Sequence, residues 1–145
     1  MNPTIRKAEP KDIQAILTIE RLGINSWKED FFVDEIKNPL SVLLVAERDD
    51  VIVGFVTAWL VHDEIQLNNI AVLPEYRRQG IAEVLIKEMV FFFKNAKKII
   101  LEVNENNTAA KEFYKKLGFT VNGKRKSYYG NDDAYLMEKD LIDEV

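Results

Sequence analysis

Residues Leu67 to Met89 read LNNIAVLPEYRRQGIAEVLIKEM, and this stretch determines the fold that we predict. It begins with a run typical of a buried strand, continues through a turn rich in arginine and glycine, and ends in an amphipathic helical pattern. A helix leaves its first four backbone N–H groups without partners inside the helix and carries about half a positive charge at that end. The stretch therefore predicts a phosphate site at the start of the helix.

Three features of the RRQGIA turn fit a phosphate ligand. Gly80 lets the backbone approach a ligand closely, and Ala82 keeps the first helical turn narrow. Arg77 and Arg78 add positive charge. An ordinary strand-to-helix connection with solvated arginines fits the same six residues, so the rest of the chain has to decide between the two interpretations.

Strand and helix patterns alternate on both sides of this stretch. Strands are predicted from short runs rich in β-branched residues, and helices from apolar residues that recur every three or four positions. In chain order we predict a strand over 4–9, helices over 10–20 and 28–37, strands over 42–48, 51–60 and 64–72, a helix over 81–92, a strand over 97–104, a helix over 107–117, and strands over 119–126 and 132–141, with 127–132 as the loop between the last two.

This order predicts one α/β domain over residues 1–145. Its expected form is a three-layer α/β/α arrangement around a mixed, largely antiparallel sheet of about seven strands and four helices. Strand 97–104 is an apolar run and is expected to be buried on both faces. The helix after the glycine turn is expected to bury a stripe formed by Ile81, Val84, Leu85, Met89 and Phe92.

Composition limits the classes of protein to consider. Of the 145 residues, 47% are hydrophobic and 30% charged, and no apolar run approaches the roughly 20 residues that span a membrane. The N-terminal segment lacks an apolar signal, so a cytoplasmic location is expected. The chain has no cysteine and a single histidine, His62, so we expect no thiolate metal site, no cysteine nucleophile and no bound metal. A net charge of −4 argues against a nucleic-acid binder.

Several motifs together resemble one enzyme family. The RRQGIA turn resembles the pyrophosphate loop of the GCN5-related N-acetyltransferases (GNAT), written Arg/Gln-x-x-Gly-x-Gly/Ala. The later segment ILEVNENNTAAKEFYKKLGF resembles RimI-type N-terminal α-acetyltransferases, and SYYGNDDAYLMEKDL resembles the same group and its Ard1-like relatives. The motifs occur in the expected order from about Ile65 to Leu141, and their joint occurrence is more specific than any one of them.

The resemblance implies a reaction and two catalytic residues. It implies direct transfer of the acetyl group of acetyl-CoA to the α-amino group of a protein N-terminus, with Glu102 as general base and Tyr114 as general acid beside the departing sulfur. An α-amino group has a pKa near 7.7–8.0 and is largely protonated at neutral pH, so a base near the amine is needed. The alternatives are a strand-end glutamate that points into solvent or pairs with a lysine, and a tyrosine that packs in the core with its hydroxyl hydrogen-bonded.

The resemblance also assigns residues to both substrates. A ribosomal protein is one candidate acceptor. Asn107, which the resemblance assigns to acetyl-CoA, could instead be a simple helix N-cap, and Asn106 could equally take that role. The loop before the second helix lacks the Phe-Pro-Trp of bacterial RimI, which leaves the preferred first residue of the acceptor open. The acetyl-CoA residues implied are Ile70, Ala71, Val72, Arg77, Arg78, Gln79, Gly80, Ile81, Ala82 and Asn107, and the acceptor residues implied are Asn25, Ser26, Trp27, Tyr128 and Tyr129.

Other functions fit parts of the sequence. A GNAT protein could acetylate a small amine or a lysine side chain instead of an N-terminus. A CoA-binding module without catalysis would not need both Glu102 and Tyr114. A nucleotide-binding protein is disfavoured, since no G-x-G-x-x-G or Walker sequence follows a strand. A monomer and a dimer are both compatible with the sequence.

Overall fold

The computed structural model describes residues 2–21, 28–130 and 132–141, and for residues 127–129 it describes the backbone alone. Among these residues the elements in chain order are β1 (Thr4–Lys7), the 3-10 turn η1 (Pro10–Asp12), α1 (Ile13–Arg21), α2 (Glu29–Lys37), β2 (Ser41–Arg48), β3 (Val51–Val61), β4 (Glu64–Val72), η2 (Pro74–Tyr76), α3 (Ile81–Phe92), β5 (Lys98–Asn104), α4 (Thr108–Lys116), β6 (Thr120–Tyr129) and β7 (Asp132–Asp140). The predicted order of strands and helices is confirmed.

The strands form a seven-stranded sheet in the order β1-β2-β3-β4-β5-β7-β6. β1–β2, β2–β3, β5–β7 and β6–β7 pair antiparallel, while β4 and β5 pair parallel, so the predicted mixed sheet is confirmed.

The chain divides into two compact units. The first unit is Met1–Leu60 with Leu67–Lys94, and the second unit is Val61–Gln66 with Asn95–Val145. A single domain over 1–145 stays a prediction.

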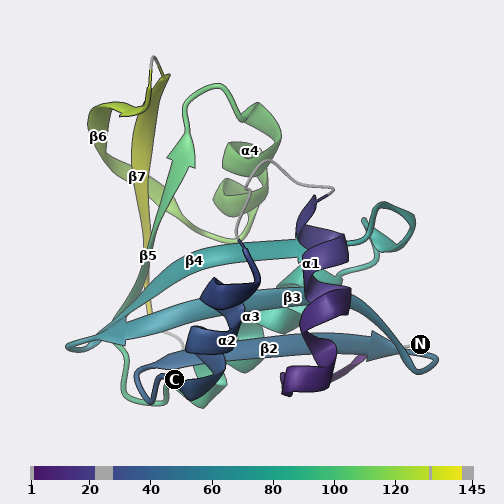
Figure 1. Cartoon of the computed structure of the whole chain (residues 1–145). Helices are drawn as coiled ribbons and strands as arrows, with labels where there is room; N and C mark the ends of the chain where they lie inside the picture. The colour runs from purple at the N-terminus through teal and green to yellow at the C-terminus, as the bar shows by residue number, and fades with distance from the viewer. Residues whose placement is uncertain (1, 22–27, 131, 142–145) are drawn as a thin grey trace. The chain divides into compact units, whose positions relative to one another are not determined.

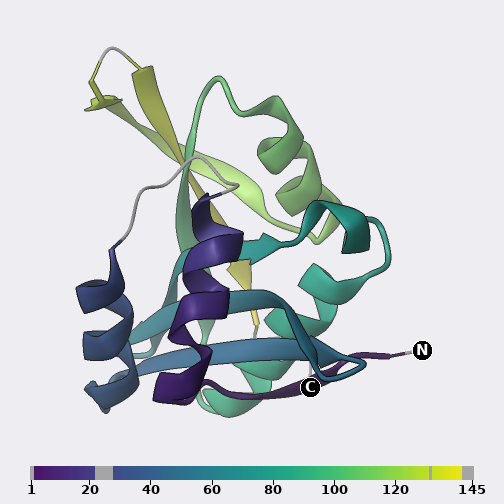
Figure 2. The same ribbon diagram turned by 45° about the vertical axis from the view of Figure 1, so that its right-hand side comes forward.

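In the first unit, helices cover both faces of the strands. α1 and α2 lie on one face of β2 and β3, and α3 lies on the opposite face, as the two views in Figures 1 and 2 agree. Between the strands and α2, the rings of Phe32 and Phe55 are fully buried and meet edge to face with their centroids 5.6 Å apart. Full burial of a side chain of this kind contributes about 1.5–3 kcal/mol. This packing gives the predicted three layers.

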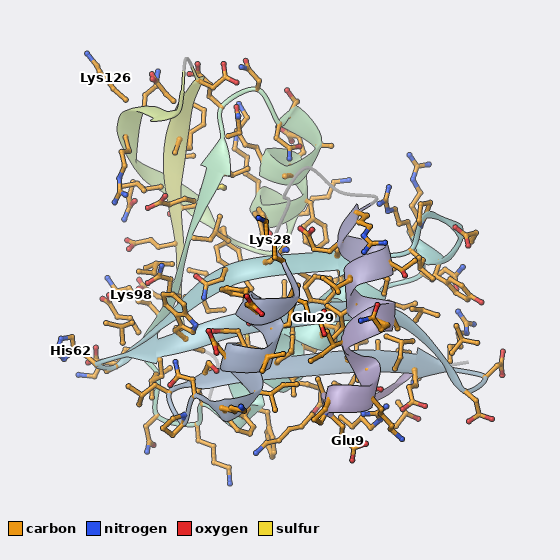
Figure 3. The ribbon with its side chains drawn as sticks, in the orientation of Figure 1. Glu9, Lys28, Glu29, His62, Lys98 and Lys126 are labelled. Carbon is orange, nitrogen blue, oxygen red and sulfur yellow. The ribbon has the colours of Figure 1, made fainter. Side chains whose placement is uncertain are left out.

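Tight turns connect the central strands. Asp49 and Asp50 both have positive φ, 54° and 65°, which gives the turn between β2 and β3 the twist that a two-residue hairpin favours. His62 also has a positive φ, 58°, and lies in the turn after β3. Figure 3 shows His62 pointing away from the ribbon at this turn.

Two buried acids fix the helices of the first unit. Asp12 accepts hydrogen bonds from Arg6 Nη1 and Nη2 at 2.7 and 2.9 Å, and this contact lowers the pKa of the Asp12 carboxyl below its usual value and raises that of Arg6. Glu35 on α2 accepts hydrogen bonds from Thr57 Oγ1 at 2.5 Å and Trp59 Nε1 at 2.7 Å. The first contact attaches β1 to the turn before α1, and the second attaches α2 to β3.

The buried residues of α3 differ from the predicted stripe at three positions, because Val84 is half-buried, Phe92 is exposed, and Ile86 is buried although it was not predicted. Ile81, Leu85, Ile86 and Met89 are buried, whereas Phe92 is 41% exposed and lies beneath the ammonium group of Lys7, 4.6 Å from the ring centroid. The prediction was therefore wrong for Phe92, whose ring lies near the surface and contacts a lysine ammonium group. None of the helices in the described ranges is long and apolar enough to cross a bilayer.

In the second unit, β5 is buried on one face rather than on both. Ile99, Leu101 and Val103 are buried, while the alternate residues from Lys98 to Asn104 are half-buried. Side chains of a strand alternate between faces, so the polar residues of this run share one face. β6 also continues to Tyr129, which pairs with Asp132, so residues 127–129 belong to a strand and not to the predicted loop.

Candidate functional site

A short loop in the first unit links the end of β4 to the start of α3. The side chain of Arg77 folds back along this loop, and its Nε donates a hydrogen bond of 3.0 Å to the carbonyl oxygen of Val72. The side-chain amide of Gln79 accepts a hydrogen bond from Arg48 and donates one of 3.4 Å to the carbonyl of Glu75. These contacts fix the loop through its side chains, so its backbone N–H groups near the helix start are available to a ligand.

The loop contains two left-handed residues immediately before α3. Arg78 has a φ of 63° and Gly80, the N-cap of α3, has a φ of 80°. A left-handed conformation costs a non-glycine residue about 1–2 kcal/mol, and such conformations concentrate at ligand sites. A Cβ on Gly80 would meet no heavy atom within 4 Å. The start of α3 thus combines open space, free amides and two exposed arginines, which suits a phosphate group.

The edge of β4 that faces β5 in the strand order is only partly paired. The ladder joins Glu64–Gln66 to Lys98–Ile100, at the beginning of both strands. Among the described residues, no strand pairs with this edge of β4 at Ile70, Ala71 and Val72. An unpaired strand edge offers alternating N–H and C=O groups to an extended ligand.

Two asparagines on β4, Asn68 and Asn69, are candidate site residues that the sequence analysis did not include. Within the described part of the chain, Asn68 Nδ2 is the only buried side-chain nitrogen or oxygen without a hydrogen-bond partner. An unsatisfied buried donor costs about 1–3 kcal/mol, and a ligand oxygen would remove this cost. Asn69 donates a hydrogen bond of 3.4 Å to Glu20, a 3% exposed carboxylate in the last turn of α1. The sequence feature that could have pointed to both residues is an Asn-Asn pair inside a predicted strand, where asparagine is disfavoured.

In the second unit, Glu102 lies on the polar face of β5. Its neighbours Leu101 and Val103 are buried on the other face, as predicted, while the Glu102 side chain is 26% exposed. Arg125 of β6 contacts it, with Nη2 3.1 Å from Oε1. The sequence left a lysine partner as one alternative, and the structure has an arginine in its place.

Asn107 is the N-cap of α4. Its Oδ1 accepts a hydrogen bond of 3.1 Å from the backbone N–H of Ala110. Asn106 does not cap the helix, and its backbone N–H instead donates to Asn104 Oδ1 at 2.9 Å. The cap uses one lone pair of the Asn107 side-chain oxygen, so the Nδ2 group is a donor that could contact acetyl-CoA without breaking the cap.

Tyr114 lies in the last turn of α4, in contact with two aromatic rings. Its ring centroid is 5.3 Å from that of Phe113 and 5.5 Å from that of Phe119, and the tyrosine is half-buried. Its carbonyl oxygen accepts hydrogen bonds from the N–H groups of Leu117 and Phe119, where the chain leaves the helix before Gly118 at a φ of 96°. The helix end predicted at residue 117 agrees with the observed C-cap at Leu117.

The structure groups some of the predicted site residues and leaves others undescribed. The first unit brings together the β4 residues 70–72 and the loop residues 77–82, and the second unit holds Glu102 on β5 with Asn107 and Tyr114 on α4. Asn25, Ser26 and Trp27 lie outside the described residues. Tyr128 and Tyr129 belong to β6, but their side chains also lie outside the described part.

Comparison with known proteins identifies the family. The model of the acetyltransferase (GNAT) family matches residues 11–119. A protein of Bacillus subtilis (strain 168), named for alanine N-acetylation of ribosomal protein bS18, is 37% identical over 139 residues. The match covers 92% of this chain and 92% of the relative. An N-alpha-acetyltransferase of Saccharolobus solfataricus (strain ATCC 35092 / DSM 1617 / JCM 11322 / P2) is 36% identical over 155 residues, with 95% of this chain and 93% of the relative covered.

A solved structure agrees with these relatives. The crystal structure of Ard1 from Thermoplasma volcanium is similar with a TM-score of 0.89 and 25% identity, and the match covers 99% of this chain and 100% of that one. The strand order, the glycine-led start of α3 and the matched sequence lead to one conclusion. The chain belongs to the acetyltransferase (GNAT) family.

Proposed function

We propose that this chain transfers the acetyl group of acetyl-CoA to the α-amino group of a protein N-terminus, directly and without a metal. The observation that carries the proposal is the loop over 77–82, where a left-handed glycine opens an anion-binding helix start beside an unpaired strand edge. The relatives named for N-terminal acetylation support the choice of acceptor, because they match the chain over nine tenths of its length.

Acetyl-CoA fits the residues of the first unit in three places. The backbone N–H groups of Ile81 and Ala82, with the charge of Arg77 and Arg78, would hold the diphosphate. The edge of β4 over 70–72 would hydrogen-bond to the pantetheine arm as an added strand does. The buried Nδ2 group of Asn68, which has no hydrogen-bond partner, could donate a hydrogen bond to an amide oxygen of the same arm.

Glu102 and Tyr114 would each move one proton of the reaction. Glu102 accepts a proton from the acceptor ammonium, directly or through one water, which frees the nitrogen lone pair, and it passes this proton on to solvent. The amine nitrogen then bonds to the thioester carbon and loses its second proton to water, and the carbon–sulfur bond breaks as the tetrahedral intermediate collapses. Tyr114 donates its hydroxyl proton to the leaving sulfur and later recovers a proton from solvent. The products are an N-acetylated protein and CoA.

The acceptor would be the first residues of a protein chain. By family analogy, residues 25–27 and the pair Tyr128 and Tyr129 would line its site. Since relatives are named for ribosomal protein bS18, a ribosomal protein in the cytoplasm is the acceptor class that we favour.

An acetylation assay tests the proposal. Purified chain and acetyl-CoA are incubated with peptides that differ in their first residue, with the same peptides blocked at the N-terminus, and with polyamines. We expect acetylation of free N-termini only. Activity confined to polyamines or to lysine side chains would refute the proposed acceptor, and CoA binding with no acetylation of any amine would favour a non-catalytic module.

Substitutions test the two catalytic roles. Glu102→Gln and Tyr114→Phe should each lower kcat by about 100-fold or more, because general acid–base catalysis contributes that much, while the Kd for CoA stays within about twofold. Glu138→Gln, at a half-buried strand glutamate that pairs with Lys98, and Tyr135→Phe are matched controls in the same unit and should retain turnover. Full activity of either test variant would remove that residue from the mechanism.

A further inference from the structure

Arg125 reaches Glu102 from two strands away. In the ladders of the second unit, Arg125 on β6 lies opposite Ala134 of β7, and Glu102 on β5 lies opposite Leu136 of β7. Ala134 and Leu136 are two residues apart, so their side chains and those of their partners share one face of the strands. Neighbouring strands are about 4.8 Å apart, so the arginine crosses the whole width of β7 to bring Nη2 within 3.1 Å of Oε1.

Small residues keep the crossing open. Ala134, opposite Arg125, has only a methyl group as its side chain, and it is fully buried. Gly123 lies opposite Leu136 and has no side chain, and a Cβ there would come within 3.1 Å of Leu136 Cδ1. A long side chain on β6 can therefore extend toward β5 on this face.

Stability alone gives little reason for this contact. The Arg125 side chain is 54% exposed and that of Glu102 is 26% exposed, and ion pairs at such exposure contribute little to folding. A general base gains more from such a partner, because proton transfer requires its oxygen within about 2.6–3.2 Å of the donor atom. A carboxylate has two oxygens, so a cation that holds Oε1 leaves Oε2 to accept a proton.

We infer that Arg125 is a positioning residue that holds the Glu102 carboxylate in the orientation that accepts the proton of the acceptor amine. The inference rests on the general-base role proposed for Glu102. Arg125 touches neither reacting atom in this scheme and acts through Glu102, as the third group of a catalytic triad acts through the base.

Lys124 provides a matched control on the same strand. It is the preceding residue of β6, it is 44% exposed, and its ammonium group contacts Glu105 at 3.3 Å and Asp133 at 3.2 Å rather than Glu102. Lys124→Gln therefore removes the same charge from the same strand and breaks ion pairs of the same exposure, while the Glu102 contact stays in place.

The experiment compares steady-state kinetics and thermal unfolding of five variants: Arg125→Gln, Arg125→Lys, Lys124→Gln, Glu102→Gln and the double variant Arg125→Gln/Glu102→Gln. We expect Arg125→Gln to lower kcat by about tenfold or more, with KM for acetyl-CoA within about twofold, and Arg125→Lys to restore part of the loss. Lys124→Gln should keep turnover near that of the unmodified chain. In the Glu102→Gln background, Arg125→Gln should add less than about a twofold loss, since residues that act as a unit are not additive.

The outcomes separate the inference from the proposed function. If Glu102→Gln lowers turnover but Arg125→Gln does not, or if Arg125→Gln causes the same loss in both backgrounds, the positioning role is refuted and the base survives. An equal loss in Lys124→Gln would also refute it, because the effect would then come from charge in general. If Glu102→Gln keeps full turnover, the base itself is refuted, and the role of Arg125 with it.

Discussion

Gly80 and Arg78 are the residues with unusual backbone conformations in the loop before α3, where we propose a phosphate site. Both have left-handed backbone conformations, with φ of 80° and 63°, and only the first lacks a side chain. No neighbouring atom lies within 4 Å of the position of a Cβ on Gly80, so packing inside the protein does not require glycine there. The backbone conformation favours glycine there, and the proposed close approach of the diphosphate gives a second reason for it.

Gly130 allows these two reasons to be separated by experiment. It has a φ of 71°, and a Cβ there would also meet no atom within 4 Å, but it follows β6 in the second unit. We expect Gly80→Ala and Gly130→Ala each to lower the free energy of unfolding by about 1–2 kcal/mol in urea titrations, because both force a side chain into the left-handed region. Only Gly80→Ala should also weaken CoA binding in calorimetry, by about tenfold. Equal affinities in both variants would contradict a phosphate site at Gly80.

Among the elements, α4 has well-defined ends and a proposed catalytic residue between them. Asn107 caps its first turn, and Gly118 ends it in a left-handed conformation. The same asparagine is proposed to contact acetyl-CoA, so its structural and functional roles have to be distinguished. They can use different atoms, since the cap uses the side-chain oxygen and a ligand contact can use the nitrogen.

Two substitutions at Asn107 distinguish these roles. Asn107→Ser keeps an oxygen that can cap the helix, whereas Asn107→Ala removes it and should lower the free energy of unfolding by about 1 kcal/mol. If Nδ2 contacts acetyl-CoA, both variants should raise the Kd for CoA, and only the alanine variant should lose stability. A serine variant with unchanged affinity and stability would show that Asn107 is a helix cap alone.

At the scale of the whole molecule, binding of the cosubstrate is expected to stabilise the folded chain. Residues 70–72 and 77–82 belong to the first unit, and Asn107 belongs to the second unit. A ligand that binds only the folded chain stabilises it by mass action, whichever part of the chain it contacts. The cosubstrate is therefore expected to act on the global unfolding transition.

Calorimetry at fixed protein concentration measures this effect. CoA at 100 times its Kd should raise the free energy of unfolding by about 2.7 kcal/mol. For a chain of this size, that corresponds to an increase in Tm of roughly 5–11 °C. ATP at the same concentration supplies phosphates without a pantetheine arm and should give a smaller increase. An equal increase with ATP would support a nucleotide site instead.

The sequence alone determined the order of the helices and strands and the family. Periodicity, turn residues and the RRQGIA motif act over a few neighbouring positions, so they can be read without a structure. The predictions from the sequence were wrong where burial or strand pairing depends on other segments. The cases are Phe92 on α3, the half-buried face of β5 and the end of β6.

Only the tertiary structure decided which polar residues surround the proposed catalytic groups. The contact between Arg125 and Glu102 depends on the registers of β6 and β5 against β7, and that between Glu20 and Asn69 depends on how α1 packs on β4. The unsatisfied amide of Asn68 likewise becomes visible only once its surroundings are folded. Register and packing join residues that are 20 or more positions apart, and local sequence patterns contain no information about such pairs.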